Sequence, residues 1–217
     1  MGADRSRRLL LVDADALLRA LLETHLLAAG FEVQSCSTPD EAKLIAERFR
    51  PTIFVGDVNL RSGQTGIDLA HELHRRSHLS AIVFLTHVSE PRMVGLSNRS
   101  VPSNAAYLDK AQLDSPLRLV QTIGASMKNS TRAEFRDDLR HHKTFQRISM
   151  SQIDALRLVA QGFSNAEIAE RRGTSLRAVE NLISRTYVAV GIERSPAVNE
   201  RVQAARLYMR YAGAEGR

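Results

Sequence analysis

The sequence predicts an α/β domain built on a doubly wound, five-stranded parallel sheet, followed by an all-α domain of four helices. Over the first 127 residues, short apolar runs alternate with amphipathic stretches. Nearly continuous apolar strands of this kind are typical of a parallel sheet with helices on both faces. From Ser149 onward, apolar residues recur every three or four positions, which indicates helices. At 217 residues the chain is long enough for two hydrophobic cores.

The elements of the first domain are predicted to alternate regularly. Each apolar run is expected to form a strand, and the amphipathic stretch after it a helix. One unit departs from this pattern, because residues 87–105 contain two prolines, a glycine and many polar residues where the fourth helix is expected. Any helix there must be short. The predicted strands are 8–12, 31–36, 53–57, 81–86 and 106–109, and the predicted helices are 16–29, 39–49, 66–76 and 115–127.

The second half of the chain begins with a polar, basic segment, 128–148, which we interpret as a linker with partly helical character. Four helices are predicted after it, at 152–161, 165–171, 176–190 and 196–211, and a glycine follows each of the first three. The predicted domains are therefore 1–127 and 149–217. Three helices have start signals, namely the N-cap pairs Ser151/Asp154 and Ser164/Glu167 and the dipeptide Ser195-Pro196.

Composition and charge limit the class of protein. The sequence is 43% hydrophobic and 25% charged, which is ordinary for a globular protein and excludes a disordered chain. The single cysteine, Cys36, cannot form an internal disulfide, and the apolar run 9–12 is too short to span a bilayer. We therefore expect a soluble, cytoplasmic protein with no membrane partner. The net charge of +6 lies entirely in residues 125–217, which suits binding to nucleic acid or another anionic surface; by itself, a solvated basic face explains it equally well.

Polar side chains stand at the ends of four predicted strands, namely Asp13 with Asp15, then Asp57, Thr86 and Lys110. In an open parallel sheet, ligands bind beyond the carboxyl ends of the strands where the strand order reverses, so these side chains are expected to share one crevice. Carboxylates with a hydroxyl and an ammonium group suit Mg²⁺ together with a phosphoryl group, and Asp57 is the natural nucleophile. The alternative is that each Asp or Thr merely caps a turn.

Four motifs at these positions occur in a joint spacing: Val12-Asp13, Asp57-Val58-Asn59, Thr86 and Tyr107-Leu108-Asp109-Lys110. In this spacing, about residues 7–127 resemble the flavodoxin-like receiver domain of two-component response regulators. The resemblance implies that Asp57 accepts a phosphoryl group from a phosphohistidine on a sensor histidine kinase. It also implies that Mg²⁺ is held by Asp13, Asp57 and the backbone carbonyl of Asn59. By the same resemblance, Lys110 pairs with the charge of the phosphoryl group, and the Thr86 hydroxyl closes onto a phosphoryl oxygen. Tyr107 then moves inward and acts as the switch.

The sequence departs from the receiver pattern at three places. Ala14 stands where the family usually has a second acidic residue, and Asp15, one residue further on, is a candidate replacement. Arg61 stands where a proline-bearing loop is common, and the segment 87–105 replaces the expected fourth helix. These departures weaken the predicted Mg²⁺ site and leave phosphorylation of Asp57 as the main hypothesis to test.

Residues 151–191 contain two short predicted helices, a tight turn at Gly173 and a longer third helix. This is helix-turn-helix geometry, in which the longer helix can enter a DNA major groove. Over about 149–210 the chain resembles the LuxR-type DNA-binding domain of NarL/FixJ response regulators. The motifs that carry this resemblance are LRLVAQG (156–162), SNAEIAER (164–171) and the stretch 175–191.

The third helix has two predicted faces. By resemblance, Glu180, Asn181 and Ser184 face the bases, while Arg177 and Arg185 suit phosphates or guanine. Without the preceding turn, a merely solvated polar face would be the better interpretation. The core face predicted by helical spacing comprises Leu176, Val179, Leu182, Ile183, Tyr187 and Val190.

The fourth helix carries an apolar stripe that is either a dimerisation surface or packing within its own domain. A homodimer would match the half-sites of double-stranded DNA, and RNA polymerase is a further candidate partner. The stripe consists of Val198, Val202, Ala205 and Tyr208.

The sequence as a whole therefore predicts a DNA-binding transcriptional response regulator that is switched by phosphorylation of Asp57 and is not an enzyme. The nearest alternative is a pseudo-receiver regulator that binds DNA without phosphorylation and is controlled by a partner, a ligand or dimerisation. Two further hypotheses are a phosphohydrolase with Asp57 as nucleophile, for which no second catalytic acid is visible, and a protein-interaction adaptor.

Overall fold

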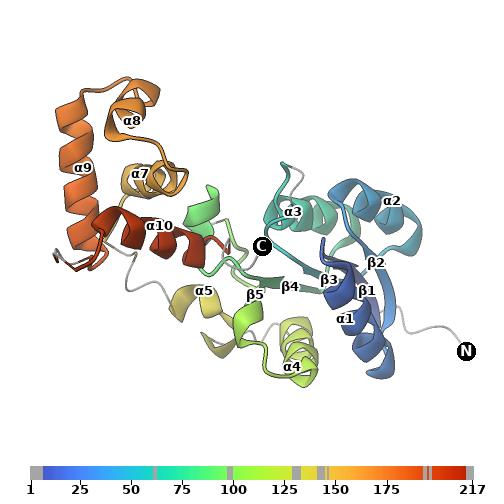
Figure 1. Cartoon of the computed structure of the whole chain (residues 1–217). Coiled ribbons are helices and arrows are strands. Elements are labelled where there is room, and N and C mark those ends of the chain that lie inside the picture. Colours follow the sequence, from blue (N-terminus) through green and yellow to red (C-terminus); the bar gives the residue numbers. More distant parts are fainter. Residues whose placement is uncertain are drawn as a thin grey trace, which may run out of the picture. The chain divides into compact units, whose positions relative to one another are not determined.

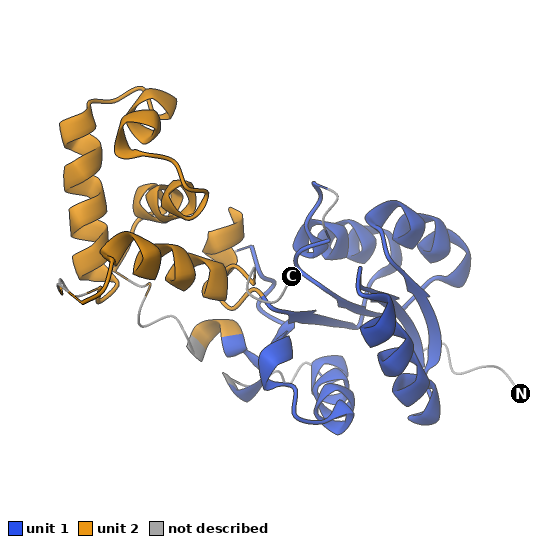
Figure 2. Cartoon of the chain, in the orientation of Figure 1, with its two compact units in different colours: residues 1–87, 99–137 blue, residues 88–98, 138–217 orange. Residues whose placement is uncertain are grey.

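The computed structural model describes residues 7–60, 63–96, 100–128, 133–140, 145, 147–192, 195 and 197–213. The chain forms two compact units, shown in Figure 2. The first, the sheet unit, comprises residues 1–87 and 99–137, and the second, the helical unit, comprises residues 88–98 and 138–217. The chain therefore passes from one unit to the other three times.

The sheet unit contains a five-stranded sheet in the order β2-β1-β3-β4-β5, with all neighbouring strands parallel (Figure 1). This order is that of the flavodoxin-like doubly wound fold, and it reverses direction between β1 and β3. The predicted fold class and all five predicted strands are confirmed. The strands are β1 (Arg8–Val12), β2 (Glu32–Cys36), β3 (Ile53–Gly56), β4 (Ala81–Thr86) and β5 (Ala106–Asp109).

Helices cover both faces of the sheet, with α2 (Pro39–Phe49) and α3 (Gly66–Ser77) on one face and α1 (Ala16–Ala28) and α4 (Pro116–Met127) on the other (Figure 1). Alternate residues of a strand point to opposite faces. In β1, Leu9 and Leu11 accordingly pack in one buried cluster with leucines of α1 and α4, while the neighbouring Leu10 is equally buried. The double covering explains why the central strands are apolar without interruption.

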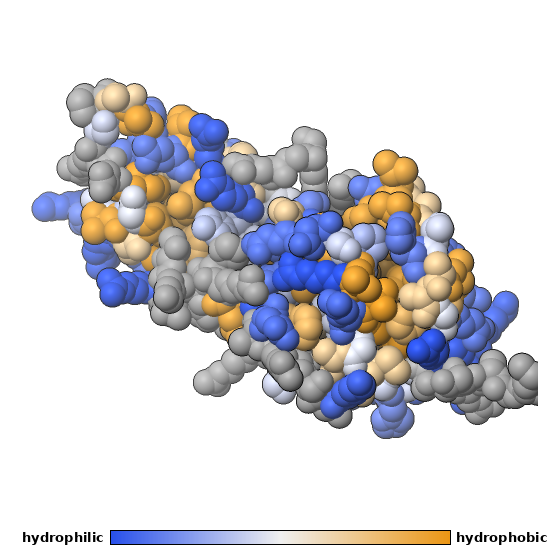
Figure 3. Space-filling model, turned by 90° about the horizontal axis from the view of Figure 1, so that it is seen from below, coloured by the Kyte–Doolittle hydropathy of each residue, from blue (hydrophilic) through white to orange (hydrophobic). Residues whose placement is uncertain are grey.

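Helix α1 has three exposed apolar side chains. Leu17, Leu21 and Leu27 are all exposed on this helix. Figure 3 shows apolar side chains lying among hydrophilic ones on the surface seen from below. Apolar residues scattered on a surface in this way are ordinary in folded proteins.

Side-chain caps fix where the helices of the sheet unit begin. Thr65 and Asp68 form a capping box at the start of α3, in which the Thr65 hydroxyl accepts from the Asp68 amide at 3.1 Å. Thr38 caps α2 and Ser115 caps α4, and in both helices a proline follows the cap. The predicted start of the last of these helices at residue 115 is therefore one residue early.

After β4, residues 88–96 and 100–105 contain no long helix, as predicted. They form only a short 3-10 helix, η2 (Pro91–Val94), capped by Glu90. Met93 is buried in the core of the helical unit, and its carbonyl oxygen accepts a hydrogen bond from the Tyr208 hydroxyl at 2.7 Å. Arg92 forms an ion pair of 3.0 Å with the buried Glu90 and donates to the Phe145 carbonyl oxygen at 2.7 Å. Residues 88–96 thus belong to the helical unit, whereas residues 100–105 belong to the sheet unit.

The four predicted helices of the helical unit are present. They are α7 (Met150–Ala160), α8 (Asn165–Arg171), α9 (Leu176–Ala189) and α10 (Glu200–Tyr211). Gly162, Gly173 and Gly191 have positive φ angles and follow the first three of these helices, as predicted. The core between the helices includes Ile153, Leu156, Ile168, Val179, Ile183 and Ala204.

Two of the three predicted helix starts in this unit are wrong. Helix α7 begins at Met150 because Ser149, not Ser151, forms the capping box, with Gln152. Helix α10 begins at Glu200 because Asn199 is its N-cap, and the predicted start at Ser195-Pro196 fails although Pro196 itself lies outside the described residues. The predicted cap at Ser164 is confirmed, since its hydroxyl accepts from the Glu167 amide at 3.2 Å.

Part of the predicted linker is well packed. It contains η4 (Ala133–Phe135) and α5 (Asp137–Arg140). Asp137 is buried and accepts hydrogen bonds from the Asp109 amide at 3.0 Å and from Arg118 at 3.2 Å, while Phe145 is fully buried in the helical unit. The boundaries at 127 and 148 stay a prediction. None of the helices in the described ranges is long and apolar enough to cross a membrane.

Candidate functional site

The sheet unit brings four of the predicted site residues together at the carboxyl ends of its strands. Asp13 directly follows β1, Asp57 directly follows β3, Thr86 ends β4, and Lys110 directly follows β5. The Asp57 amide donates to the Val12 carbonyl oxygen at 3.0 Å, so the sheet hydrogen bonding continues up to the carboxylate that it presents. The site lies where the strand order reverses, as expected for an open parallel sheet.

Lys110 joins the two carboxylates of this site. Its Nζ atom lies 2.6 Å from Asp13 Oδ2 and 2.8 Å from Asp57 Oδ2, and all three side chains are largely buried. Burial acts to lower the pKa of the Lys110 ammonium, but the negative charges of Asp57 and Asp13 outweigh it, so the pKa lies above its usual value. Lys110 therefore carries a fixed positive charge beside Asp57 at neutral pH.

The second oxygen of Asp57 is held by hydrogen bonds. The Thr86 hydroxyl donates to Asp57 Oδ1 at 2.5 Å, and the Asn59 amide donates to the same atom at 2.9 Å. On the adjoining strand β5, Tyr107 pairs with Phe84, two residues before Thr86, and its ring is fully buried with its centroid 6.1 Å from that of Phe84. Tyr107 is therefore already buried in this structure, and its inward movement as a switch stays a prediction.

Asp15, the candidate replacement for the acidic residue missing at Ala14, serves as the N-cap of α1. Its Oδ1 atom accepts from the amides of Leu17 and Leu18, each at 3.0 Å. The hydrogen bond from the Leu18 amide is the main reason why the pKa of Asp15 lies below its usual value. The Asp15 carboxylate is therefore engaged in capping α1.

Two further residues shape the site, although neither was singled out from the sequence. Arg19 on α1 donates through Nη1 to the Asp13 carbonyl oxygen at 2.5 Å. Gly66 allows close approach of the backbone, since a Cβ there would lie 1.9 Å from the Asp57 carbonyl oxygen. A glycine that opens the helix after the Asp57 strand was the available signal for this contact.

The donor set fits Mg²⁺ through oxygen atoms only. Asp13 and Asp57 offer carboxylates and Asn59 offers its backbone carbonyl, whereas no group of three His, Cys, Asp or Glu side chains suited to a metal occurs in the described part of the chain. Proteins usually hold Mg²⁺ with one or two carboxylates and leave several positions to water and phosphate oxygens. The residues present therefore fit Mg²⁺ by their chemistry, although Lys110 pairs with both carboxylates.

In the helical unit, α9 presents the predicted DNA-binding face. All five predicted contact residues are exposed on this helix: Arg177, Glu180, Asn181, Ser184 and Arg185. On the opposite face Val179, Ile183 and Tyr187 are buried, as predicted. Leu176, expected in the core, is 46% exposed because it occupies the first turn, just after the Ser175 cap.

An apolar residue on the same exposed face was missed from the sequence. Val188 is 77% exposed, and it follows Asn181 by two helical turns and Ser184 by one. In protein–DNA complexes an apolar side chain on such a face can contact the methyl group of thymine. The sequence pattern that could have identified Val188 is its helical spacing from Asn181 and Ser184.

Ion pairs and hydrogen bonds hold the helix-turn-helix together. Arg172, in the turn, pairs with Asp154 on α7 and donates to the Ser151 hydroxyl at 2.6 Å. Arg201 on α10 donates to Asn165 Oδ1 at 2.9 Å and so joins α10 to the start of α8. These contacts fix the turn before α9 to α7, and the start of α8 to α10.

Comparison with known proteins agrees with this geometry. Residues 9–98 match the family model described as the response regulator receiver domain. A stretch of 95 residues is 33% identical to the "Probable transcriptional regulator ycf27" of Pyropia yezoensis, and it covers 43% of this chain and 38% of that protein. The "Probable transcriptional regulator ycf29" of Cyanophora paradoxa is 23% identical over 196 residues, which covers 83% of this chain and 89% of the relative.

Solved structures show the same fold over nearly the whole chain. The response regulator RcsB in complex with DNA aligns with a TM-score of 0.62 at 16% identity, covering 95% of this chain and 98% of RcsB. RcsB from Salmonella enterica serovar Typhimurium, bound to promoter rprA with the phosphomimetic BeF3−, aligns with a TM-score of 0.56 at 16% identity and covers 91% and 98%. Residues 9–98 thus match a response regulator receiver domain, in a chain whose two-unit fold is similar to that of RcsB.

Proposed function

We propose that the protein is a DNA-binding transcriptional response regulator switched by phosphorylation of Asp57 by a sensor histidine kinase. The observation that carries this proposal is the arrangement around Asp57. One carboxylate oxygen faces the Lys110 ammonium, and the other accepts from the Thr86 hydroxyl. The match of residues 9–98 to the receiver family model supports the same assignment.

The proposed chemistry is a phosphoryl transfer. An oxygen atom of Asp57 attacks the phosphorus of a phosphohistidine, the new O–P bond gives an acyl phosphate, and the P–N bond to the histidine breaks. Lys110 pairs with the charge of the transferred group. Asp13, Asp57 and the Asn59 carbonyl would hold Mg²⁺, which would supply further charge neutralisation when bound.

The same residues can report phosphorylation. Thr86 now donates its hydroxyl to Asp57 Oδ1. Once Asp57 carries a phosphoryl group, that hydroxyl is expected to turn to a phosphoryl oxygen. Tyr107, on the adjoining strand, is expected to stay buried when Thr86 turns. The chain enters the helical unit at Val88, two residues after Thr86, which gives a covalent route for the change.

DNA binding is assigned to α9. Glu180, Asn181 and Ser184 would read base edges and Arg177 and Arg185 would contact phosphates or guanine. All five side chains are exposed on one helix. The ycf27 and ycf29 relatives, which are probable transcriptional regulators, and the complex of RcsB with DNA support this assignment.

Dimerisation on DNA is assigned to α10 and the turn before it. The residues of the predicted apolar stripe differ in their surroundings. Val198 and Val202 are exposed, whereas the Tyr208 hydroxyl donates a hydrogen bond to the Met93 carbonyl oxygen within the helical unit. We propose that Val198 and Val202 belong to a homodimer contact. Two bound RcsB dimers are described in one of the similar structures.

Phosphorylation is tested by incubating the protein with Mg²⁺ and acetyl phosphate and measuring its intact mass. One phosphoryl group is expected on the wild type and none on Asp57→Asn, and operator affinity should rise only in the wild type. The same treatment with a chelator present is the control for Mg²⁺. An unchanged mass, with DNA binding intact in Asp57→Asn, would contradict the switch.

That contrary result would favour a regulator that binds DNA without phosphorylation. Two observations support this second candidate, namely Ala14 in place of an acidic residue and the Lys110 ammonium already spanning both remaining carboxylates.

DNA contact by α9 has a separate test. The double variant Arg177→Ala with Arg185→Ala should reduce the slope of log affinity against log salt by about 2, since each phosphate contact contributes about one unit. Arg206→Ala, an exposed arginine on α10, is the control and should change the slope little. An unchanged slope in the double variant would favour a protein-interaction adaptor.

A further inference from the structure

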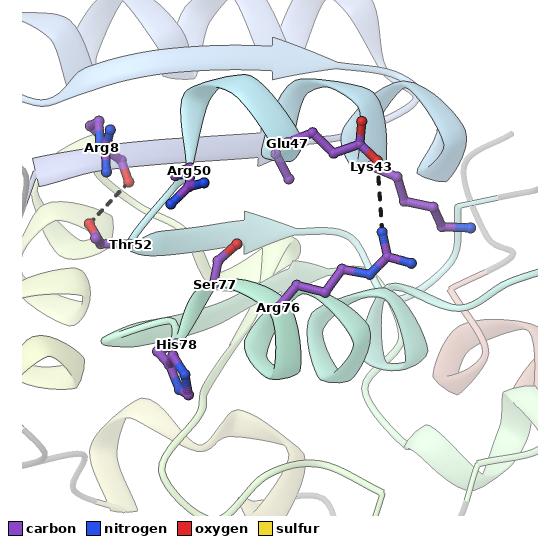
Figure 4. A pocket seen from close by; sticks show the side chains of 9 residues that line it. Arg8, Lys43, Glu47, Arg50, Thr52, Arg76, Ser77 and His78 are labelled. Carbon is purple, nitrogen blue, oxygen red and sulfur yellow. Dashed lines mark hydrogen bonds and ion pairs between the residues drawn. The ribbon is translucent and has the colours of Figure 1, made fainter.

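A cavity of about 490 Å³ opens at the edge of the sheet opposite the Asp57 site (Figure 4). It lies at the amino-terminal ends of the strands, with Arg8 starting β1 and Thr52 preceding β3. The carboxyl-terminal ends of α2 and α3 complete its wall. The volume falls in the range of about 300–1,000 Å³ that is typical of small-molecule sites.

Two of the cations that line this cavity are already neutralised by acidic neighbours. Arg76 lies 2.9 Å from Glu72 and 4.0 Å from Glu47. Lys43 lies 3.4 Å from Asp40 and 3.8 Å from Glu72. These side chains form the rim on the α2 and α3 side and leave little net charge there.

The other two cations, Arg8 and Arg50, make no ion pair and no side-chain hydrogen bond with any described residue. The Nε atom of Arg8 is buried without an acceptor, although its guanidinium lies 6.0 Å from the centroid of the Phe49 ring. Buried polar groups in proteins normally have a hydrogen-bond partner, and an exception calls for a cause such as a bound ion or water. The charge of the cavity therefore comes mainly from these two arginines.

The backbone at Arg50 adds a second observation. Arg50 ends α2 in the left-handed conformation, with a φ angle of 49°, and His78 ends α3 in the same way with a φ angle of 50°. Glycine or asparagine is the usual residue at such a position. Here both strained positions carry long or ionisable side chains that line the cavity, and Figure 4 shows Ser77 pointing into the space between Arg50 and Arg76.

We propose that this cavity binds a phosphate-bearing small molecule of nucleotide size through the guanidinium groups of Arg8 and Arg50. Arginine is suited to this task because its planar group binds phosphate oxygens with two parallel hydrogen bonds. The Ser77 hydroxyl is available as a further donor. The competing explanation is that these cations only offset the negative ends of the α2 and α3 dipoles, in which case no anion binds.

The test is a titration of the full-length, ¹⁵N-labelled Asp57→Asn protein with ADP in the presence of a chelator, so that phosphoryl chemistry at the opposite edge plays no part. Amide shifts should saturate at Arg50, at Thr52 and at residues 76–78, with a dissociation constant of about 1 mM or tighter. Replacing Arg8→Gln and Arg50→Asn together should weaken binding about tenfold or more. Asparagine tolerates the left-handed conformation, so the fold should be kept.

The matched control is Arg48→Gln with Arg75→Gln, which removes the same charge from exposed positions on α2 and α3 that do not line the cavity. This pair should bind ADP like the parent protein. Arg50→Asn alone is measured in parallel and should weaken binding in the same direction. The absence of saturable shifts up to about 10 mM ADP, or an equal loss in the control pair, would overturn the proposal.

Discussion

Lys110 governs the charge balance of the Asp57 site. Its ammonium group lies between two largely buried carboxylates, at 2.6 Å from Asp13 and 2.8 Å from Asp57. Removing one partner of a buried ion pair costs more than the pair itself contributes, because the remaining charge stays buried without compensation. At this site two like charges would also remain side by side.

We expect Lys110→Met to lower the free energy of unfolding of the sheet unit by about 3 kcal/mol at neutral pH. Adding Asp57→Asn should recover about 1 kcal/mol or more, because it removes one of the two facing charges. Urea unfolding followed by far-UV circular dichroism measures both, since the chain has no tryptophan. Lys43→Met removes a half-buried lysine of α2 whose partner Asp40 is exposed, and it should cost less than about 1 kcal/mol. Strict additivity of Lys110→Met and Asp57→Asn would contradict the coupling.

Tyr208 gives a prediction for the dependence of stability on pH. Burial raises the pKa of Tyr208 above its usual value, although the charge of Arg157 acts against this. A group whose pKa is raised on folding stabilises the fold fully below its unfolded pKa, near 10 for tyrosine, and this contribution is lost as the pH rises through the folded pKa. The ionised phenol can no longer donate to the Met93 carbonyl oxygen.

Tyr208→Phe should therefore lower the free energy of unfolding by about 1 kcal/mol at pH 8, and the difference from the wild type should shrink as the pH rises above about 10. Chemical unfolding at a series of pH values measures it. The raised pKa of Tyr187 affects both proteins equally and cancels. A difference that stays constant up to about pH 11 would show that the Tyr208 proton is not involved.

Among single residues, the sequence predicted those at the ends of strands. It did not predict residues whose position depends on packing between elements. Asp57, Thr86 and Lys110 were predictable because each follows an apolar run at a fixed place in the βα repeat. The exposure of Leu176 was not, because periodicity alone does not show that the first turn of a helix projects beyond its neighbours. The contact of Arg19 with the Asp13 carbonyl depends on how α1 packs, which spacing does not reveal.

Among the elements, the strands and most helices followed from periodicity, whereas some helix starts did not. Ser149 and Ser151 are both good N-cap residues, and the structure uses the first because Gln152 completes its capping box while Ser151 binds Arg172. The start of α10 was missed for a similar reason. Asn199 caps the helix because its side chain accepts hydrogen bonds from the amides of Arg201 and Val202. Ser195, also a good N-cap residue, was predicted in its place.

The element that sequence reasoning placed least well is the segment after β4. Its prolines showed that a long helix is absent, but they did not show that Met93 joins the core of the helical unit. Apolar character predicts burial and does not specify which of two cores receives the side chain. Arg92 holds this segment, through its ion pair with Glu90 and its hydrogen bonds to the carbonyl oxygens of Phe145 and Ile148.

Arg92→Met should destabilise the helical unit by about 3 kcal/mol, because Glu90 would remain buried without its partner. Amide hydrogen exchange is expected to accelerate in α7 and α10, which contact the segment, and to stay unchanged in β1 and β3. Glu90→Gln with Arg92→Met should recover part of the loss, since no buried charge is left. Equal acceleration in both units, or none in α7, would contradict the assignment of this segment to the helical unit.

For the whole molecule, connectivity matters more than either unit alone. The chain passes between the units after residues 87, 98 and 137, so the helical unit contains a loop that both begins and ends in the sheet. A tandem arrangement of two domains joined by one linker, as the sequence predicted, would offer one covalent route between them. The loop adds two more, and one of them starts two residues after Thr86.

Phosphorylation of Asp57 should therefore change amide hydrogen exchange in residues 88–94 other than Pro91, because Thr86 turns from Asp57 to the phosphoryl group and the following residues are fixed to α10. The Ser89 amide donates to the Tyr211 carbonyl oxygen at 3.1 Å, which makes it a direct reporter. Acetyl phosphate with Mg²⁺ should alter exchange there in the wild type and leave Asp57→Asn unchanged. Thr86→Ala should still gain the phosphoryl mass but lose most of the change in exchange. A phosphorylated wild type with unaltered exchange at 88–94 would show that the signal takes another route.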